Sequence, residues 1–268
     1  LYRYIQDHKL KVMIDTPDPG WGSVMGNALD HGVGYTTAYF RDHFGAHCGM
    51  EVVLANGEVL RTGMGALPGA KSWQDFRYGF GPWVDGLFGQ GNYGIVTKMG
   101  IWLMPQPEAY QTGLVIVPRH QDLIPLIDVV NYLEDSGLIG QPEYGSPLAP
   151  QFGGAGPPDP ELMTLMASPE VPDSARIDAY AARVGKGVWQ VNLQFYGPAK
   201  TVAANWEHAR ERMTLAIPAA QFVEGPGYRF PLTKEEEDRH PHKVAIGVPN
   251  LAVFAIGTRS ATNPTPSD

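Results

Sequence analysis

The chain has 268 residues, of which 43 % are hydrophobic and 18 % charged, so it is long enough and apolar enough to bury a core in two modest domains. Its formal net charge is −8 with a pI near 5.5 and no basic run, which argues against nucleic acid or an anionic membrane as a partner. No apolar stretch approaches the roughly 20 residues that span a bilayer. The single cysteine permits no internal disulfide, so the compartment stays unknown.

The first ten residues predict the tail of an amphipathic helix, and residues 12–14 a short strand. A glycine-rich segment, residues 20–57, follows and contains the only cysteine and three of the eight histidines. Glycine lets backbone amides approach a ligand closely, so the segment is either a cradle for an anionic or flat ligand or a loop that packs tightly. Its end predicts a strand over 50–54 and a hairpin at Asn56-Gly57.

Residues 63–81 are expected to be loop-rich, residues 85–88 a helical turn, and the apolar run 95–104 a buried strand. Residues 89–94 match the pattern G-x-G-x-x-G. A dinucleotide fingerprint needs a strand before this pattern and a helix after it, whereas a β-branched run follows here. We therefore reject a Rossmann fold.

A boundary is expected near residue 107, because the pattern changes there. The second half predicts a strand at 113–117, a helix from Asp122 to Gly137 with Leu123, Ile127, Val130 and Leu133 buried, and a surface insert over 138–173 with a short helix near 161–167. A helix at 174–184, a strand at 189–195 and a helix at 201–215 follow. This order predicts an α+β layer with helices on one face of a sheet. Residues 233–243 are expected to be a solvated charged turn.

Asp42 is the first candidate for chemistry. Because it stands among bulky neighbours such as Phe40 and Phe44, we expect partial desolvation, which favours the protonated form. A carboxylate of this kind can take or give a proton, although an exposed Asp42 paired with Arg41 is the alternative.

His43, His47 and Cys48 do not predict a metal site, because the surrounding glycines argue against a helix that would align them. His31 and His43 are expected either to hydrogen-bond near a ligand or to be satisfied polar groups, and Cys48 to pack as a small hydrophobe. No nucleophilic triad can be assembled.

Several runs of the first half together resemble one known family. They are GSVMGNALDHGVGYT (22–36), DHF (42–44), CGMEVVLANG (48–57), RTGMG (61–65), YGFGP (78–82), DGLF (85–88) and GNYGIVTKMGIWLMP (91–105). They resemble the vanillyl-alcohol oxidase and p-cresol methylhydroxylase flavoproteins, closely over residues 17–107 and less closely beyond.

The resemblance implies part of a PCMH-type FAD-binding domain over residues 1–107, followed by part of an α+β substrate cap over 108–268. The implied FAD-binding residues are Gly22, Ser23, Gly26, Asn27, Gly32, Tyr35, Gly94, Ile95 and Thr97. Asp42 would assist at the reacting centre, beside the reactive flavin nitrogen.

The implied activity is FAD-dependent oxidation of 4-substituted phenols by hydride transfer from the benzylic carbon to the flavin. Oxygen or a c-type cytochrome would take the electrons, and the full-length protein would be a homo-oligomer. The chain is expected to be an internal piece of such an enzyme and inactive alone, because the phenolate-binding residues and the covalent flavin link have no matching motif here. Two alternatives stay open: a flavoenzyme of the same fold acting on another alcohol, a hydroxy acid or a sugar, and a non-catalytic protein whose cradle binds another anion.

Overall fold

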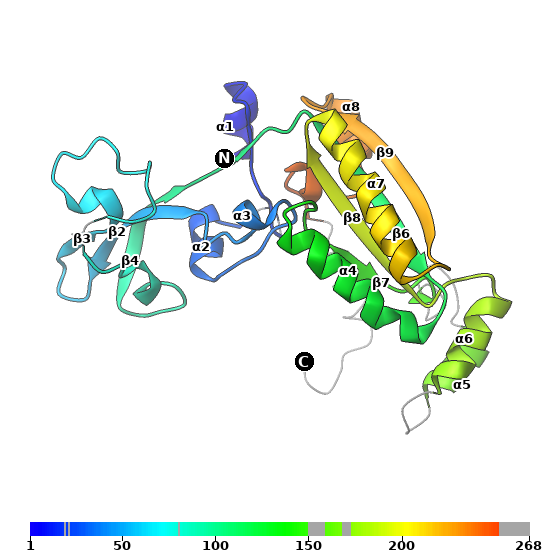
Figure 1. The fold of residues 1–268 in the computed structure, drawn as a ribbon. Helices are drawn as coiled ribbons and strands as arrows, with labels where there is room; N and C mark the ends of the chain where they lie inside the picture. The colour runs from blue at the N-terminus through cyan, green and yellow to red at the C-terminus, as the bar shows by residue number, and fades with distance from the viewer. Residues whose placement is uncertain (19, 21, 80, 150–158, 168–172, 252–268) are drawn as a thin grey trace. The chain divides into compact units, whose positions relative to one another are not determined.

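The computed structural model describes residues 1–251 except 19, 21, 80, 150–158 and 168–172 (Figure 1). The chain divides into two compact units. Unit 1 contains residues 1–106 and the described residues from Leu232 onwards, and unit 2 contains Pro107–Pro231. The division at 106/107 adjoins the boundary expected from the sequence, but residues 232–251 group with unit 1 and not with the segment expected to be the cap. Which unit binds a cofactor and which covers a substrate stays a prediction.

Unit 1 is built around a three-stranded antiparallel sheet in the order β3-β2-β4. Its strands are β2 (His47–Leu54), β3 (Val59–Arg61) and β4 (Gly94–Ile101), and a second small sheet pairs β1 (Val12–Met13) with β5 (Met104–Pro105). The helices of unit 1 are α1 (Tyr2–Asp7), α2 (Val24–Leu29), α3 (Ala38–Arg41) and α8 (Lys234–Arg239). Short 3₁₀ turns span Gly63–Ala66, Asp85–Leu87 and Val244–Ile246. A small core joins β2 and β4 to the turn at 85–88: Phe44, Met50, Val52, Phe88 and Val96.

The hairpin at Asn56-Gly57 is confirmed. Gly57 has a φ of +83°, in the left-handed region that glycine adopts without strain, and the Leu54 N–H donates to the Glu58 carbonyl at 2.9 Å across the turn. The rejection of a Rossmann fold is also confirmed, because the strand β4 begins at Gly94 where that motif requires a helix.

One expectation for β4 is wrong, and one helix of unit 1 was not expected. The run 95–104 is not buried throughout: Val96 lies in the core, but Ile95 on the other face of β4 is 72 % exposed. An apolar run cannot by itself distinguish a strand covered on both faces from one covered on a single face. The glycine-rich segment contains the helix α2, which the sequence analysis did not predict and which Ser23 caps by accepting the Gly26 N–H at 3.1 Å.

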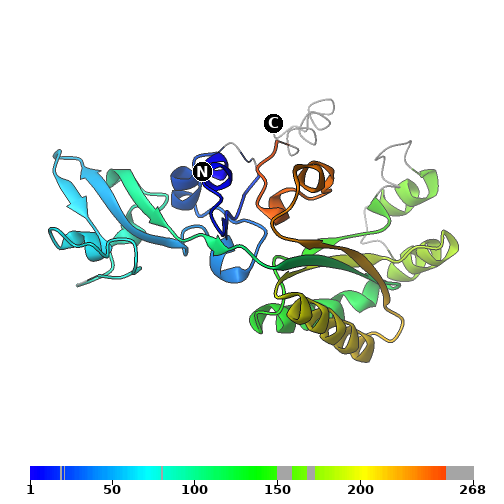
Figure 2. The same ribbon diagram turned by 90° about the horizontal axis from the view of Figure 1, so that it is seen from above.

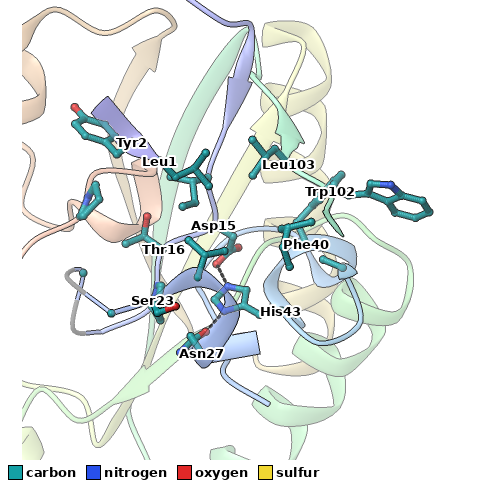
Figure 3. Close-up of a pocket in the computed structure, with 18 of the residues that line it drawn as sticks. Leu1, Tyr2, Asp15, Thr16, Ser23, Asn27, Phe40, His43, Trp102 and Leu103 are labelled. Carbon is teal, nitrogen blue, oxygen red and sulfur yellow. Dashed lines mark hydrogen bonds and ion pairs between the residues drawn. The ribbon is translucent and has the colours of Figure 1, made fainter. Parts of the chain in front are cut away.

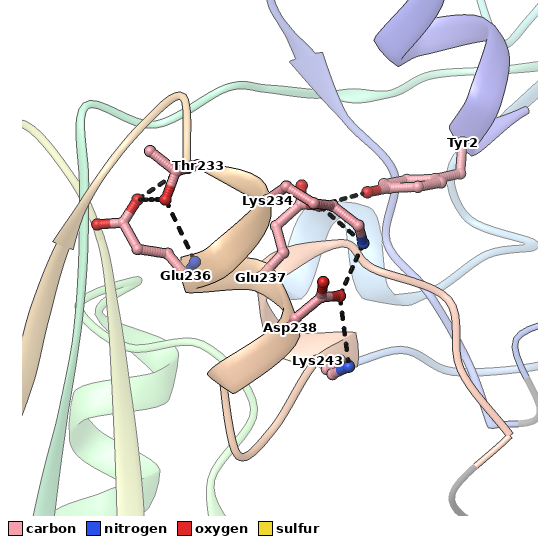
Figure 4. Close-up of polar contacts among 7 residues, drawn as sticks. All are labelled: Tyr2, Thr233, Lys234, Glu236, Glu237, Asp238 and Lys243. Carbon is pink, nitrogen blue, oxygen red and sulfur yellow. Dashed lines mark hydrogen bonds and ion pairs between the residues drawn. The ribbon is translucent and has the colours of Figure 1, made fainter.

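Residues 233–243 are not a solvated charged turn as expected: they contain the helix α8 (Figure 4). His240, which follows the helix, is buried. Thr233 and Glu236 form a reciprocal capping box at its start. Glu237 is buried and accepts the Tyr2 hydroxyl at 2.9 Å, so α8 attaches to α1 within unit 1. Burial and the Glu237 carboxylate raise the pKa of Tyr2. The prediction failed because acidic residues are typical both of the first turn of a helix and of a solvated loop, and charge alone does not distinguish the two.

Unit 2 is a four-stranded antiparallel sheet in the order β7-β8-β6-β9. The strands are β6 (Ala109–Val117), β7 (Glu143–Gly145), β8 (Trp189–Gly197) and β9 (Gln221–Arg229), and the helices are α4 (Leu123–Asp135), α5 (Pro160–Met166), α6 (Ser174–Arg183) and α7 (Ala199–Ala216). Figures 1 and 2 show α4 and α7 side by side on one face of the sheet, which confirms the predicted α+β layer. A continuous hydrophobic core lies between these two helices and the sheet, and it contains Val115, Val191, Leu193, Phe195 and Trp206.

The sequence analysis did not predict β9, and it predicted the buried residues of α4 only in part. Gly225, Pro226 and Gly227 interrupt the alternation expected of a strand, and an edge strand such as β9 tolerates them because one side needs no ladder partner. On α4 the buried residues are Leu126, Val129, Val130 and Leu133. The expected insert over 138–173 also carries β7 and the confirmed short helix α5; its remaining parts, 150–158 and 168–172, lie outside the described residues.

Within the described part of the chain, every helix is too short or too polar to cross a membrane.

Candidate functional site

A cavity of about 540 Å³ opens in unit 1 beside the start of α2 (Figure 3). Four segments form its wall: the exit from β1 (Ile14–Pro17), the start of α2 with its preceding glycines, α3 with the residues after it, and the end of β4 with Trp102 and Leu103. The N-terminal residues 1–3 and Pro249 complete it. Ligand sites generally have a volume of this order, and it is sufficient for a flat ring system.

One wall of the cavity carries a row of three hydrogen-bonded side chains from separate segments: Asp15, His43 and Asn27. Nε2 of His43 lies 3.1 Å from Oδ1 of Asp15, and Nδ1 of His43 contacts Oδ1 of Asn27. Figure 3 shows the imidazole between the two partners. The side chains of Asp15 and His43 are 4 % and 11 % exposed, so the contact is shielded from solvent.

Asp15 also holds the glycine-rich segment in place. Its carboxylate accepts the backbone N–H of Tyr35 at 3.1 Å and of Thr36 at 2.9 Å, and it contacts the Thr36 hydroxyl. The Tyr35 hydroxyl donates to Asp18 at 2.7 Å. The exit from β1 is thereby bound to the turn before α3.

The cavity offers polar and apolar surfaces to a ligand. The hydroxyl of Thr16 is buried in its wall with no hydrogen-bond partner among the described residues, and a buried polar group without a partner costs free energy unless a ligand or water satisfies it. Ile14, Phe40, Ile101 and Leu103 present carbon to the same space. A flat heteroaromatic ring with polar edges, such as that of a flavin, fits this combination.

The structure brings together only some of the residues that sequence analysis associated with FAD. Gly22, Ser23 and Asn27 line the cavity, and Gly26 lies beside them on α2. Tyr35 is attached to the wall through Asp15. Gly94, Ile95 and Thr97 lie on β4 at the end opposite to the cavity-lining Ile101. The FAD role of each residue stays a prediction.

Tight packing accounts for two glycines of this segment. A Cβ on Gly32 would lie 2.2 Å from the Asn27 amide nitrogen, and one on Gly34 would lie 1.2 Å from the Asp15 carboxylate. Gly94 is similarly closed by Val52, at 2.6 Å. Gly26 differs, because a Cβ there would meet nothing nearer than 3.4 Å. Tight packing therefore holds at Gly32 and Gly34, and the ligand cradle stays a prediction.

Asp42 is exposed and lies outside the cavity wall. Its carboxylate accepts the Gly45 N–H at 2.8 Å and so caps the turn that leads into β2, while its backbone pairs with Val33. The desolvation expected from its aromatic neighbours is not found, because Asp42 is exposed. The catalytic role of Asp42 stays a prediction.

A second network of polar side chains, which the sequence did not reveal, is buried within unit 1. Nε2 of His47 and the hydroxyl of Thr62 each lie 2.9 Å from Oδ2 of Asp85, and the Thr62 hydroxyl accepts the Met50 N–H at 2.8 Å. His47 and Asp85 are 0 % and 1 % exposed. Their separation by 38 positions leaves no local signal. The network holds the 3₁₀ turn at 85–87 against β2.

Cys48 is buried next to this network, as expected of a small hydrophobe. Within the described residues, no three His, Cys, Asp or Glu side chains lie close enough together to hold a metal ion.

The buried thiol predicts a pH-dependent stability. Burial, with a smaller contribution from Asp75, raises the pKa of Cys48 to about 11. Because the folded state keeps the thiol proton to a higher pH than the unfolded state, this contribution is complete below pH 9.0 and is lost as the pH rises through about 11. The urea midpoint of the native protein should therefore fall more over this interval than that of Cys48→Ala. Equal falls would mean that the thiolate forms without penalty.

No family model matches the chain. It does have relatives among characterised proteins and solved structures. It is 36 % identical over 261 residues to the 4-cresol dehydrogenase [hydroxylating] flavoprotein subunit of Pseudomonas putida, covering 96 % of this chain and 47 % of that protein. It is also 37 % identical over 142 residues to 1'-carboxy-chondrochloren decarboxylase of Chondromyces crocatus, covering 52 % of this chain and 25 % of that protein.

Among solved structures, p-cresol methylhydroxylase with substrate bound matches with a TM-score of 0.72 and 35 % identity over 95 % of this chain and 48 % of that one. The isoeugenol complex of 4-ethylphenol oxidase from Gulosibacter chungangensis matches with a TM-score of 0.73 and 33 % identity, over 96 % and 48 %. The chain therefore belongs to the p-cresol methylhydroxylase type of flavoproteins, and it spans about half the length of the relatives that it matches.

Proposed function

We propose that the chain is part of an FAD-dependent oxidoreductase that oxidises 4-substituted phenols. The observation that carries this proposal is the similarity, over nearly the whole chain, to two proteins named for cresol and for 4-ethylphenol. Both names specify a phenol with an alkyl group para to the hydroxyl. Such a substrate can lose a hydride from its benzylic carbon, because the phenolate oxygen stabilises the resulting quinone methide.

We further propose that the cavity beside α2 receives part of the FAD. Gly22, Ser23 and Asn27 line it, the Thr16 hydroxyl needs a partner there, and apolar side chains provide a surface for a flat ring. Gly26, Gly32 and Tyr35 would hold the adjoining backbone. Gly94, Ile95 and Thr97 would contact another portion of the same elongated cofactor, in keeping with the exposure of Ile95.

When bound, the flavin would supply the hydride-accepting chemistry. The contribution of this chain is binding and orientation. The apolar wall would exclude water from the ring, and the Asn27 and Thr16 side chains would provide hydrogen bonds. Asp42, which immediately precedes the cavity-lining His43 in the sequence, would hold or move a proton near the reacting centre.

The electron acceptor is oxygen or a c-type cytochrome, and the full-length enzyme is a homo-oligomer with a small phenol as its substrate. Unit 2 would be part of the cap over that substrate. This chain alone would be inactive, since about half the length of its relatives has no counterpart in it.

The test uses the full-length gene product. We expect a flavin absorption spectrum that bleaches when 4-ethylphenol or vanillyl alcohol is added without oxygen. Readmission of air would restore the spectrum of an oxidase but not that of a cytochrome-coupled dehydrogenase. A flavin spectrum that no phenol bleaches would contradict the substrate class, and failure to bind added FAD would contradict the whole proposal.

A further inference from the structure

A groove of about 710 Å³ lies on unit 1 and is distinct from the cavity beside α2. Its wall consists mainly of six residues: Tyr39, Met64, Phe76, Arg77, Tyr78 and Trp102. Trp102 lines both spaces, but Figure 3 shows its indole directed away from Asp15 and His43. The indole therefore contributes to the groove and not to the cavity.

The wall of the groove is aromatic and open to solvent. Tyr39, Phe76 and Tyr78 each leave more than half of their surface exposed. Tyr39 stacks on Trp102, with the ring centroids 5.9 Å apart and the planes inclined by 15°. The indole N–H of Trp102 donates to the Gln74 carbonyl at 2.9 Å, so the polar edge of this ring is satisfied and its orientation fixed. The groove thus offers flat apolar ring faces, against which another aromatic ring packs well.

Arg77 is the only charged residue among the described residues that line the groove. Its guanidinium lies over the rings of Tyr78 and Trp83, 5.7 and 5.3 Å from their centroids. Within the described part of the chain, Arg77 forms no ion pair, and its Nε is buried without a hydrogen-bond partner. Two aromatic rings attract a cation but do not neutralise it. The charge of Arg77 is therefore uncompensated, and a carboxylate complements a guanidinium through paired N–H donors.

We propose that the groove binds a small aromatic carboxylate, whose ring packs among Tyr39, Phe76 and Trp102 and whose anionic group contacts Arg77. The ring faces and the single uncompensated charge together define this class of ligand. A neutral ring would leave the guanidinium unpaired, and an aliphatic acid would leave the ring faces without a partner. The groove lies outside the cavity proposed for FAD, and its use does not depend on the proposed function.

A small molecule fits the groove better than a protein segment does. The groove presents one positive charge, which one carboxylate neutralises, whereas the recognition of acidic protein segments relies on clusters of arginines. Its volume also lies in the range of small-molecule sites, and Met64 is an unbranched side chain that can adjust to a bound ring. A benzene ring with one carboxylate, such as 4-hydroxybenzoate, has the required size and charge.

Isothermal titration of the full-length protein with 4-hydroxybenzoate tests the proposal, first without added flavin and then with FAD. We expect saturable binding with a Kd of about 1 mM or below in both cases. The neutral 4-hydroxybenzamide has the same ring but lacks the charge that Arg77 complements, so it should bind at least about tenfold more weakly. Equal affinities for the acid and the amide would overturn the proposal. Binding that disappears when FAD is added would also overturn it, because the acid would then occupy the cavity beside α2.

Two substitutions separate the contributions of charge and ring. Arg77→Met removes the charge and should reduce the affinity for the acid to that for the amide. Phe76→Ala removes one ring face and should weaken the binding of both ligands by about two- to tenfold, the usual contribution of one aromatic contact. Phe76 is exposed and Arg77 is half-buried, so both variants should fold, which thermal unfolding checks. The matched control is Arg176→Met, at an exposed position on α6 of unit 2, which should change neither Kd.

Two further outcomes would contradict the proposal. If Arg77→Met binds the acid as tightly as the native protein does, the acid occupies another site. If the native protein binds 4-hydroxybenzoate more weakly than about 1 mM, the groove is not a small-molecule site, and its exposed rings would fit a contact with another protein segment. A full-length protein that fails to bind FAD would contradict the proposed function and would leave the titration with 4-hydroxybenzoate unaffected.

Discussion

Replacing Asp42 by asparagine is expected to slow the reduction of the flavin by a 4-alkylphenol by about 10²–10⁴-fold, the usual contribution of a positioned acid or base. Asparagine retains an oxygen that can accept the Gly45 N–H, so the turn before β2 should keep its cap. The melting temperature should therefore stay the same, and only the charge and the proton are removed. Anaerobic stopped-flow mixing of the full-length protein with 4-ethylphenol measures the rate.

Asp30→Asn is the matched control for this prediction. Asp30 is another exposed acid of the same glycine-rich segment, at the end of α2, and its side chain interacts with Gln90. Its replacement changes the net charge equally and should leave the rate unaltered. An unchanged rate in Asp42→Asn as well would show that Asp42 caps a turn and does no chemistry.

Trp206→Ala is expected to cost unit 2 about 3–5 kcal/mol of unfolding free energy, the usual range for a buried aromatic side chain. Trp206 on α7 is 4 % exposed and packs edge-on to Phe195 and Phe222, with ring centroids 5.8 and 6.2 Å away. Its ring fills the space over Gly113, where a Cβ would lie 2.2 Å from it. Gly113 beneath the ring has no side chain that could fill the space left behind.

Urea-induced unfolding followed by circular dichroism measures this loss. Leu215→Ala is the control on the same helix, because Leu215 is 77 % exposed and its truncation should change stability by no more than about 0.5 kcal/mol. A loss below about 1 kcal/mol in Trp206→Ala would mean that the core under α7 collapses around the missing ring.

The elements predicted well from the sequence are those whose signals are local. The hairpin at Asn56-Gly57 depends on two residues with a preference for positive φ, and α4 and α7 depend on apolar residues repeated at helical spacing. The family was recognisable for the same reason, since its runs are contiguous in the first half of the chain. Where the local signal was ambiguous, as in the acidic α8 or the glycine-interrupted β9, the prediction failed or was not made.

The sequence by itself therefore determined the α+β class, the family and the segment that carries the candidate site. The tertiary structure alone decided how that segment works. Asp15 and His43 are 28 positions apart and His47 and Asp85 are 38 apart, so no spacing rule connects them. It also decided that Gly32 and Gly34 make room for neighbouring side chains whereas Gly26 stays open. The physical reason is that hydrogen bonds and close packing depend on distance in space, which local propensity does not encode.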